Sequence, residues 1–209
     1  MDGRRPRVLK ANRRAVKEAA RTVRSGGLII YPTDTVYGLG CDPFNVRAVR
    51  RVFEVKGREA KRPLPVLASS LEEILRIAVL DEEALRLARS FWPGPLTLVV
   101  PRKPVLPDVV TCGLPSVGVR VPRHEFALEV IRACGGLLVG TSANRSGRPA
   151  PRTAQEAISE LGDRVDLVID AGPAPLGMPS TVLDLTGPEP KVIRVGGLPL
   201  ERLRLFFKA

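Results

Sequence analysis

Short apolar runs alternate along this chain with longer segments of helical periodicity, and this alternation restricts the fold more than any other feature. The runs at 28–31, 64–68 and 96–100 predict buried strands, because they are short, apolar and bounded by Gly, Pro or polar residues. The segments at 12–25 and 45–56 are amphipathic, and each begins at an asparagine, a preferred helix N-cap. Strands that alternate with helices predict an α/β protein.

The remaining segments predict a mixed sheet. Further strands are expected at 117–121, 137–140, 165–169, 181–185 and 192–195, and further helices at 70–79, 81–91, 125–134 and 153–161. From residue 165 on, the strands follow one another through Gly- and Pro-containing turns, so part of the sheet is expected to be antiparallel. We therefore expect one domain, built on a twisted mixed sheet that is flanked by helices.

The charge balance favours anionic partners. The chain has 33 Lys and Arg residues against 22 Asp and Glu residues, a formal charge of +11, which suits nucleotides or nucleic acids. A solvated arginine surface is the alternative explanation. Three cysteines without a CxxC pair indicate neither a disulfide framework nor a cysteine zinc site, and they fit a reducing cytoplasm. No apolar run approaches the length of a membrane span, so we expect a soluble, cytoplasmic protein without a membrane partner.

Several common catalytic and nucleotide-binding motifs are absent from the sequence. His124 is the only histidine, which disfavours a histidine metal site and a Ser-His triad, and it is expected at a helix start. Neither GxxxxGK[ST] nor GxGxxG occurs, so a P-loop or a Rossmann fingerprint is not available for a nucleotide.

Cations and hydroxyls in predicted turns remain as candidates for a site. Lys56-Gly57-Arg58 ends the helix at 45–56, and Ser142-Ala143-Asn144 follows the strand at 137–140. Positioned cations without a covalent nucleophile suit phosphoryl or nucleotidyl transfer. A solvated basic turn and a flexible loop are the alternative interpretation of these two segments. The wider set comprises Arg62, Ser116, Arg120, Arg152, Ser180, Thr181 and Arg194.

Together these segments resemble the YrdC-like family of threonylcarbamoyl-AMP synthases, whose signature is a KxR motif followed much later by SxN. Lys56-Gly57-Arg58 corresponds to KxR, and Ser142-Ala143-Asn144 corresponds to SxN. The resemblance extends in order over about residues 12–197, which we expect to form the core of a single YrdC-like domain spanning residues 1–209. It also includes the segments 31–40, 62–64, 92–97, 117–122, 179–184 and 193–196.

The resemblance implies a twisted α/β fold around a large, positively charged cavity. It also implies a reaction of ATP, L-threonine and bicarbonate or CO2 that yields threonylcarbamoyl-AMP and pyrophosphate. This reaction is the first step in forming N6-threonylcarbamoyladenosine in tRNA, and a separate threonylcarbamoyl transferase carries out the second. Mg2+ would accompany ATP by bridging its phosphates.

The resemblance also implies roles for individual residues. Lys56 and Arg58 would be catalytic. ATP would contact Lys56, Arg58, Arg62, Ser116, Ser142, Asn144, Arg152 and Arg194. Threonine would contact Thr33, Thr35, Arg120, Ser142 and Ser180, with Arg120 pairing with its carboxylate.

Three positions depart from the usual family pattern. Glu59 stands where proline is common, Thr141 replaces a frequent proline, and Leu67 stands where many members have a histidine that touches threonine. These differences bear on amino-acid affinity. The chain ends at Ala209 after a short predicted helix, so we expect the form without an additional C-terminal domain.

Two other functions are compatible with these residues. An RNA-binding module would use the basic cavity directly. An aromatic content of 4%, however, leaves few side chains on which bases could stack. The basic cavity also allows a weak contact with the tRNA backbone, and such a contact would be strongly salt-dependent. The second alternative is a carbamoyl-transfer domain, because similar folds occur in larger carbamoylating enzymes, although such enzymes need partner domains that we do not expect here.

Overall fold

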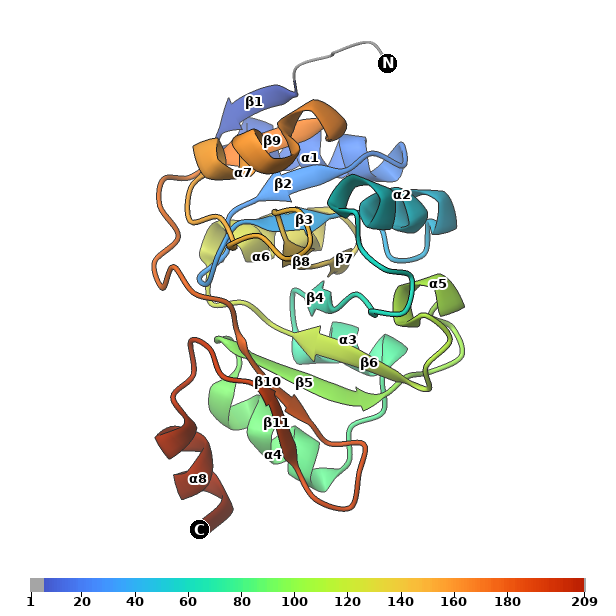
Figure 1. Ribbon diagram of the computed structural model, residues 1–209, viewed down its shortest axis with the longest axis vertical. Helices are drawn as coiled ribbons and strands as arrows, with labels where there is room; N and C mark the ends of the chain where they lie inside the picture. The colour runs from blue at the N-terminus through green and yellow to red at the C-terminus, as the bar shows by residue number, and fades with distance from the viewer. Residues whose placement is uncertain (1–5, 209) are drawn as a thin grey trace.

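Two β-sheets, rather than the single sheet expected from the sequence, form the centre of the molecule (Figure 1). This computed structural model describes residues 6–208. The first sheet contains, in spatial order, β1 (Arg7–Lys10), β9 (Leu167–Asp170), β2 (Ile29–Tyr31), β3 (Gly38–Gly40) and β8 (Thr141–Ser142). The second contains β11 (Lys191–Arg194), β10 (Thr181–Asp184), β5 (Leu96–Pro101), β6 (Ser116–Arg120), β4 (Val66–Ala68) and β7 (Leu137–Val139).

Both sheets are mixed, so the expected combination of parallel and antiparallel strands is confirmed. β9 runs parallel to β1 and β2, whereas β3 is antiparallel to β2 and β8. The strands after residue 165 divide between the sheets: β9 belongs to the first, while β10 pairs with β5 and with β11 in the second. The sequence pattern identified these strands but not their partners, because strand pairing depends on contacts between residues distant in the chain.

Helices connect and cover the sheets. They are α1 (Arg13–Arg24), α2 (Val46–Lys56), α3 (Leu71–Ile77), α4 (Glu82–Phe91), α5 (Asp108–Thr111), α6 (Glu125–Ala133), α7 (Ala154–Leu161) and α8 (Leu200–Lys208), with a 3₁₀ turn at Gly162–Arg164. The side chains of Asn12 and Asn45 accept hydrogen bonds from the amides of Ala15 (3.0 Å) and Ala48 (3.1 Å), which confirms both predicted N-caps. Within residues 6–208, none of the helices combines the length and apolarity needed to cross a membrane.

The end of α2 fixes where the KxR motif lies. Gly57 has a φ of 57°, in the left-handed region that favours glycine, and its amide donates to Glu54 O at 3.1 Å. This C-cap ends the helix directly after Lys56 and turns the chain before Arg58. His124 begins α6 as predicted, and its Nδ1 accepts a hydrogen bond from the amide of Ala127 at 3.2 Å.

Apolar side chains from both sheets form one large core, and a second cluster packs α1 and α6 against β2 and β9. α1 and α6 lie behind the first sheet in the view of Figure 1. Ala15, Val23, Ile29 and Ile131 belong to this second cluster, and each is at most 1% exposed. Full burial of a valine or isoleucine side chain contributes roughly 1.5–3 kcal/mol, so this packing stabilises the first sheet beside the site.

Candidate functional site

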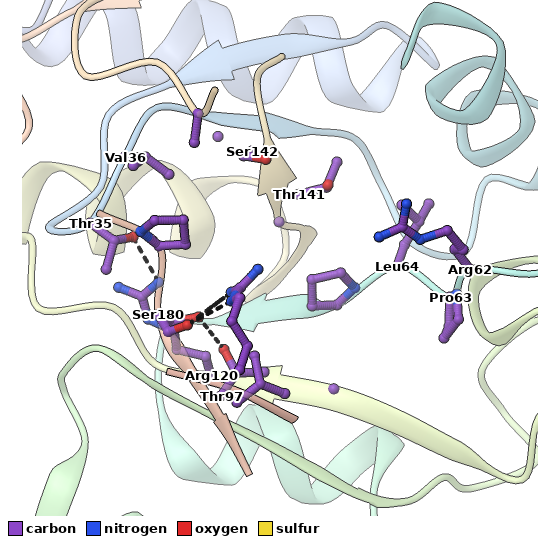
Figure 2. Close-up of a pocket in the computed structure, with 18 of the residues that line it drawn as sticks. Thr35, Val36, Arg62, Pro63, Leu64, Thr97, Arg120, Thr141, Ser142 and Ser180 are labelled. Atoms are coloured by element: carbon purple, nitrogen blue, oxygen red, sulfur yellow. Dashed lines mark hydrogen bonds between the residues drawn. The ribbon is translucent and has the colours of Figure 1, made fainter. Parts of the chain in front are cut away.

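A cavity of about 590 Å³ lies between the two sheets (Figure 2). Gly38 of β3 and Ser142 of β8 line it from the first sheet, and Thr97 of β5 and Arg120 of β6 line it from the second. In Figure 2, Arg62 and Pro63 lie on one side of the view, while Thr35 and Ser180 lie on the other. The cavity therefore has two chemically different ends: a basic turn on one side, and hydroxyls around a buried guanidinium on the other.

Lys56 connects the two motifs that define the sequence signature. Its side chain is 2% exposed, and its Nζ donates to the carbonyl oxygens of Ser142 at 2.5 Å and Asn144 at 2.6 Å. The amide of Ser146 in turn donates to the carbonyl oxygen of Lys56 at 2.9 Å. The end of α2 and the loop after β8 are thus held together by Lys56, with the ammonium group at the cavity wall.

The surroundings of Lys56 are unfavourable to its positive charge. Burial lowers the pKa of Lys56 to about 7; the charge of Arg58 acts in the same direction, the charge of Glu160 opposes the shift, and the charge of Arg62 again favours it. Within residues 6–208 Lys56 forms no ion pair with a carboxylate. An anion bound in the cavity would therefore stabilise the charged form of this side chain.

Arg58 shapes the basic turn that follows α2. Its Nε donates to the carbonyl oxygen of Arg62, and its Nη2 donates to that of Pro63, each at 2.8 Å. Burial, with the neighbouring charge of Arg62, lowers the pKa of Arg58. These two bonds hold the end of the turn at 57–63 against its beginning, and Lys61 and Arg62 line the cavity from this turn.

Arg120 is held in a buried ion pair with Asp34. The Arg120 side chain also donates from Nε to Gly94 O at 2.8 Å and from Nη1 to Thr35 Oγ1 at 2.9 Å. Burial lowers the pKa of Arg120, and the charge of Asp34 counteracts this shift. Asp34 Oδ2 is buried without a hydrogen-bond partner in the part of the chain that the structure describes.

The turn at 33–36 is fixed by its own hydroxyls. Thr33 Oγ1 donates to the carbonyl oxygen of Val36 at 2.6 Å and lies 2.9 Å from Thr35 Oγ1. Both threonines are almost fully buried. Together with the bond from Arg120, these contacts keep Thr35 facing the cavity (Figure 2).

Arg194 and Thr97 both contact Ser180. Arg194 donates from Nε and Nη2 to the carbonyl oxygen of Ser180 at 3.0 and 2.9 Å, and from Nη2 to its Oγ at 3.2 Å. Thr97 Oγ1 lies 2.8 Å from Ser180 Oγ. Burial lowers the pKa of Arg194.

Thr181 does not line this cavity, and its Oγ1 donates instead to the carbonyl oxygen of Leu198 at 2.7 Å. The structure brings eleven of the other twelve predicted site residues to the cavity. They are Thr33, Thr35, Lys56, Arg58, Arg62, Ser116, Arg120, Ser142, Asn144, Ser180 and Arg194. Arg152 does not line the cavity. It lies beside Gly177, where an added Cβ would come within 2.2 Å of Arg152 Nε.

The sequence did not point to several residues of the site, including the cavity-lining hydroxyls of Thr141 and Ser146. Lys61 and Arg148 line the cavity as additional cations, and Thr97 lines it as a further hydroxyl. Asp34 forms the buried ion pair with Arg120. Lys61 lies close to the KxR motif and Arg148 close to the SxN motif, so their positions in the sequence could have identified them as site residues. No local pattern distinguishes Asp34 or Thr97, because their roles depend on partners far along the chain.

Among residues 6–208, seven lysine and arginine side chains line the cavity, and no aspartate or glutamate does. Of these seven, only Arg120 forms an ion pair with a carboxylate among residues 6–208. The same residues contain no group of three or more His, Cys, Asp or Glu side chains that would hold a metal ion. The side chains at this cavity therefore favour an anionic ligand.

Comparison with known proteins gives consistent matches. A family model for Sua5, YciO and YrdC proteins, described as "Telomere recombination", matches residues 21–196. A threonylcarbamoyl-AMP synthase of Pyrococcus abyssi is 44% identical over 189 residues, which cover 90% of this chain and 56% of that protein. A putative threonylcarbamoyl-AMP synthase of Mycobacterium tuberculosis is 40% identical over 191 residues, which cover 91% of this chain and 88% of that protein.

A solved structure agrees with these matches. The crystal structure of P. abyssi Sua5 complexed with L-threonine has a TM-score of 0.91 and 41% identity, and the match covers 96% of this chain and 59% of that one. This chain thus spans somewhat more than half the length of the P. abyssi relative and most of the length of the mycobacterial one.

Proposed function

This chain belongs to the Sua5, YciO and YrdC family, and we propose that it synthesises threonylcarbamoyl-AMP from ATP, L-threonine and bicarbonate or CO2, with release of pyrophosphate. The cations of the KxR segment meet the SxN segment at one cavity, which no described carboxylate lines, and this convergence carries the proposal. The names of the relatives and the L-threonine in one related structure support it. The cavity is then positively charged, as a site for a nucleoside triphosphate requires.

The chemistry of the reaction requires a sheltered, cationic site. The threonine amine and bicarbonate combine with loss of water to a carbamate, which is unstable in bulk solvent. A carbamate oxygen then attacks the α-phosphorus of ATP, and the bond from that phosphorus to the β-phosphate oxygen breaks. Positioning and stabilisation of phosphate charge account for most of the catalysis in such a transfer, so no covalent nucleophile is needed.

On this proposal the basic turn and Lys56 hold the triphosphate. Lys56 and Arg58 stabilise the charge that develops on the phosphate oxygens, while Arg62 and Lys61 extend the cationic wall. The remaining nucleotide contacts come from Ser116, Ser142, Asn144 and Arg194, which line the cavity, whereas Arg152 does not line it and stays a proposed contact. The phosphates of ATP would hold Mg2+, because no carboxylate among residues 6–208 lines the cavity.

The opposite end of the cavity suits the amino acid. Arg120 has five N–H bonds, and its three interactions leave two of them for a substrate carboxylate. Thr33, Thr35, Ser142 and Ser180 provide the hydroxyls for the other polar groups of L-threonine. Leu67 forms an apolar wall beside them.

We also propose that a separate threonylcarbamoyl transferase consumes the product in tRNA modification, because the activated carbamate would otherwise hydrolyse. Three free cysteines support a reducing cytoplasm as the compartment. Any direct tRNA contact would involve the backbone and weaken steeply with salt.

The experiment that tests this function measures pyrophosphate release by the purified protein with ATP, Mg2+, L-threonine and bicarbonate. Each substrate is omitted in turn, and the product is identified by mass. Release that requires both threonine and bicarbonate would establish the synthase. Absence of release in the complete mixture would reject it, and salt-sensitive RNA binding or carbamoyl-phosphate-dependent activity would then identify which alternative holds.

A further inference from the structure

Thr97 is a buried hydroxyl to which the function proposed above gives no role. It lies on β5, is 5% exposed, and lines the cavity together with Ser180, which is 6% exposed. The two hydroxyl oxygens lie 2.8 Å apart, and Figure 2 shows the bond between them at the cavity. β5 and β10 are neighbouring parallel strands, so the backbone holds this pair in a fixed register.

The hydrogen bonds of this pair leave one hydroxyl hydrogen without an acceptor. Ser180 Oγ receives a hydrogen bond from Arg194 Nη2, and one further hydrogen is used between Ser180 and Thr97. Neither hydroxyl has another side-chain or backbone partner within residues 6–208. Whichever of the two donates in the mutual bond, the other retains an O–H that needs an acceptor.

The neighbouring charge indicates what kind of acceptor this is. Arg194 lies against the pair with no carboxylate partner in the described chain, whereas the charge of Arg120 is balanced by Asp34. A free O–H beside an unbalanced guanidinium favours an anionic oxygen. On the proposed function, two substrate groups have this chemistry: the carboxylate of threonine and the carbamate formed on its amine.

We propose that Thr97 is a positioning residue of the amino-acid site, which orients the hydroxyl of Ser180 so that the pair donates one O–H to an anionic oxygen of the substrate. This inference rests on the proposed function for the identity of the substrate. Arg194 contacts the same serine, so the Thr97–Ser180 pair also lies where the nucleotide and amino-acid contacts of the site meet.

The test compares Thr97→Val, which keeps the shape but removes the hydroxyl, with Thr97→Ser, which keeps the hydroxyl. Thr111→Val is the matched control, because Thr111 is equally buried and does not line the cavity. L-Threonine binding is measured by calorimetry with and without bicarbonate, and threonine and ATP KM values are measured by pyrophosphate release. Ser180→Ala and the Thr97→Val/Ser180→Ala double variant complete a double-mutant cycle.

We expect Thr97→Val to weaken the amino-acid interaction roughly tenfold, with the ATP KM within about twofold of wild type and Thr97→Ser close to wild type. In the Ser180→Ala background the same change should have almost no additional effect. Weaker binding of threonine alone assigns the carboxylate as the acceptor, and an effect only with bicarbonate assigns the carbamate.

Three results would overturn the inference: Thr97→Val behaving like Thr111→Val, Thr97→Ser losing as much as Thr97→Val, or full additivity with Ser180→Ala. Wild-type protein that binds no threonine would overturn both this inference and the proposed function. Wild-type protein that binds threonine but releases no pyrophosphate would reject the proposed function alone, because the binding comparison remains valid.

Discussion

The ammonium nitrogen of Lys56 lies 2.5 Å from the carbonyl oxygen of Ser142, although the two residues are 86 positions apart in the chain. This contact, with the parallel bond to Asn144, makes the KxR and SxN segments one structural unit. Both carbonyl oxygens accept a hydrogen bond from Nζ, so the protonated side chain keeps one further N–H for a ligand in the cavity. The two segments therefore act together on whatever anion binds there.

Lys56→Met should remove most of the catalytic activity. The substitution keeps the length of the side chain but deletes the charge beside the proposed phosphate site, and loss of one such donor typically lowers turnover by roughly 10² to 10³. Turnover is measured as threonine-dependent pyrophosphate release. Lys103→Met is the matched control, because Lys103 does not line the cavity and its ammonium group donates to Leu75 O. Normal turnover in Lys56→Met would remove Lys56 from the mechanism.

Lys56 should also make the stability of the unliganded protein depend on pH. Burial lowers the pKa of Lys56 to about 7 from an ordinary value of 10.5. Between these values the unfolded chain keeps the proton that the folded protein has released, so the free energy of unfolding rises with pH. Below about pH 7 both states are protonated, and this group adds no further pH dependence.

Urea unfolding at pH 6.5 and pH 9 for wild type and Lys56→Met measures this contribution. The stability of wild type relative to the variant should increase between the two pH values, because all other titrating groups are shared. Parallel curves for the two proteins would show that Lys56 stays charged in the folded protein.

Asp34→Asn should destabilise the protein strongly, because it leaves the buried Arg120 without a counter-charge. Removal of one partner from a buried ion pair typically costs about 3–5 kcal/mol. Asp108→Asn is the matched control: Asp108 pairs with Arg102, but its side chain is 78% exposed, so its loss should cost under about 1 kcal/mol. Urea unfolding measures both. Similar small losses in the two variants would mean that Asp34 does not balance the charge of Arg120.

The local structure around the site was predictable from the sequence. Asn45 before an amphipathic segment and Gly57 after it define α2, and they correctly place Lys56 at its C-terminal end. Local signals suffice here, because capping and periodicity involve residues only a few positions apart. The motif resemblance added the grouping of distant residues around one cavity.

The pairing of strands and the buried charge were not predictable in the same way. β3 consists of Gly38, Leu39 and Gly40, which have little strand propensity, yet it joins β2 to β8 and helps to form the first sheet. The sequence pattern did not identify β1, β3 or β8, three of the five strands of the first sheet, so a second sheet was not expected. The sequence around Asp34 is typical of a turn. Only the structure shows that Asp34 balances the charge of Arg120, which lies in the other sheet.

Gly140→Ala should impair the amino-acid end of the cavity through Leu67. An added Cβ at Gly140 would lie 2.2 Å from Leu67 Cγ, and both residues line the cavity, so Leu67 must move. Leu67 is the strand partner of Arg120, so we expect weaker threonine binding and a loss of about 1–3 kcal/mol in stability from overpacking. Calorimetry and urea unfolding measure the two effects, with Gly187→Ala, where the nearest atom is 3.8 Å away, as control.

Adding Leu67→Ala should restore part of both losses, because it removes the clashing atoms. A double variant no better than Gly140→Ala would place the damage in the backbone at Gly140 and not in the contact with Leu67.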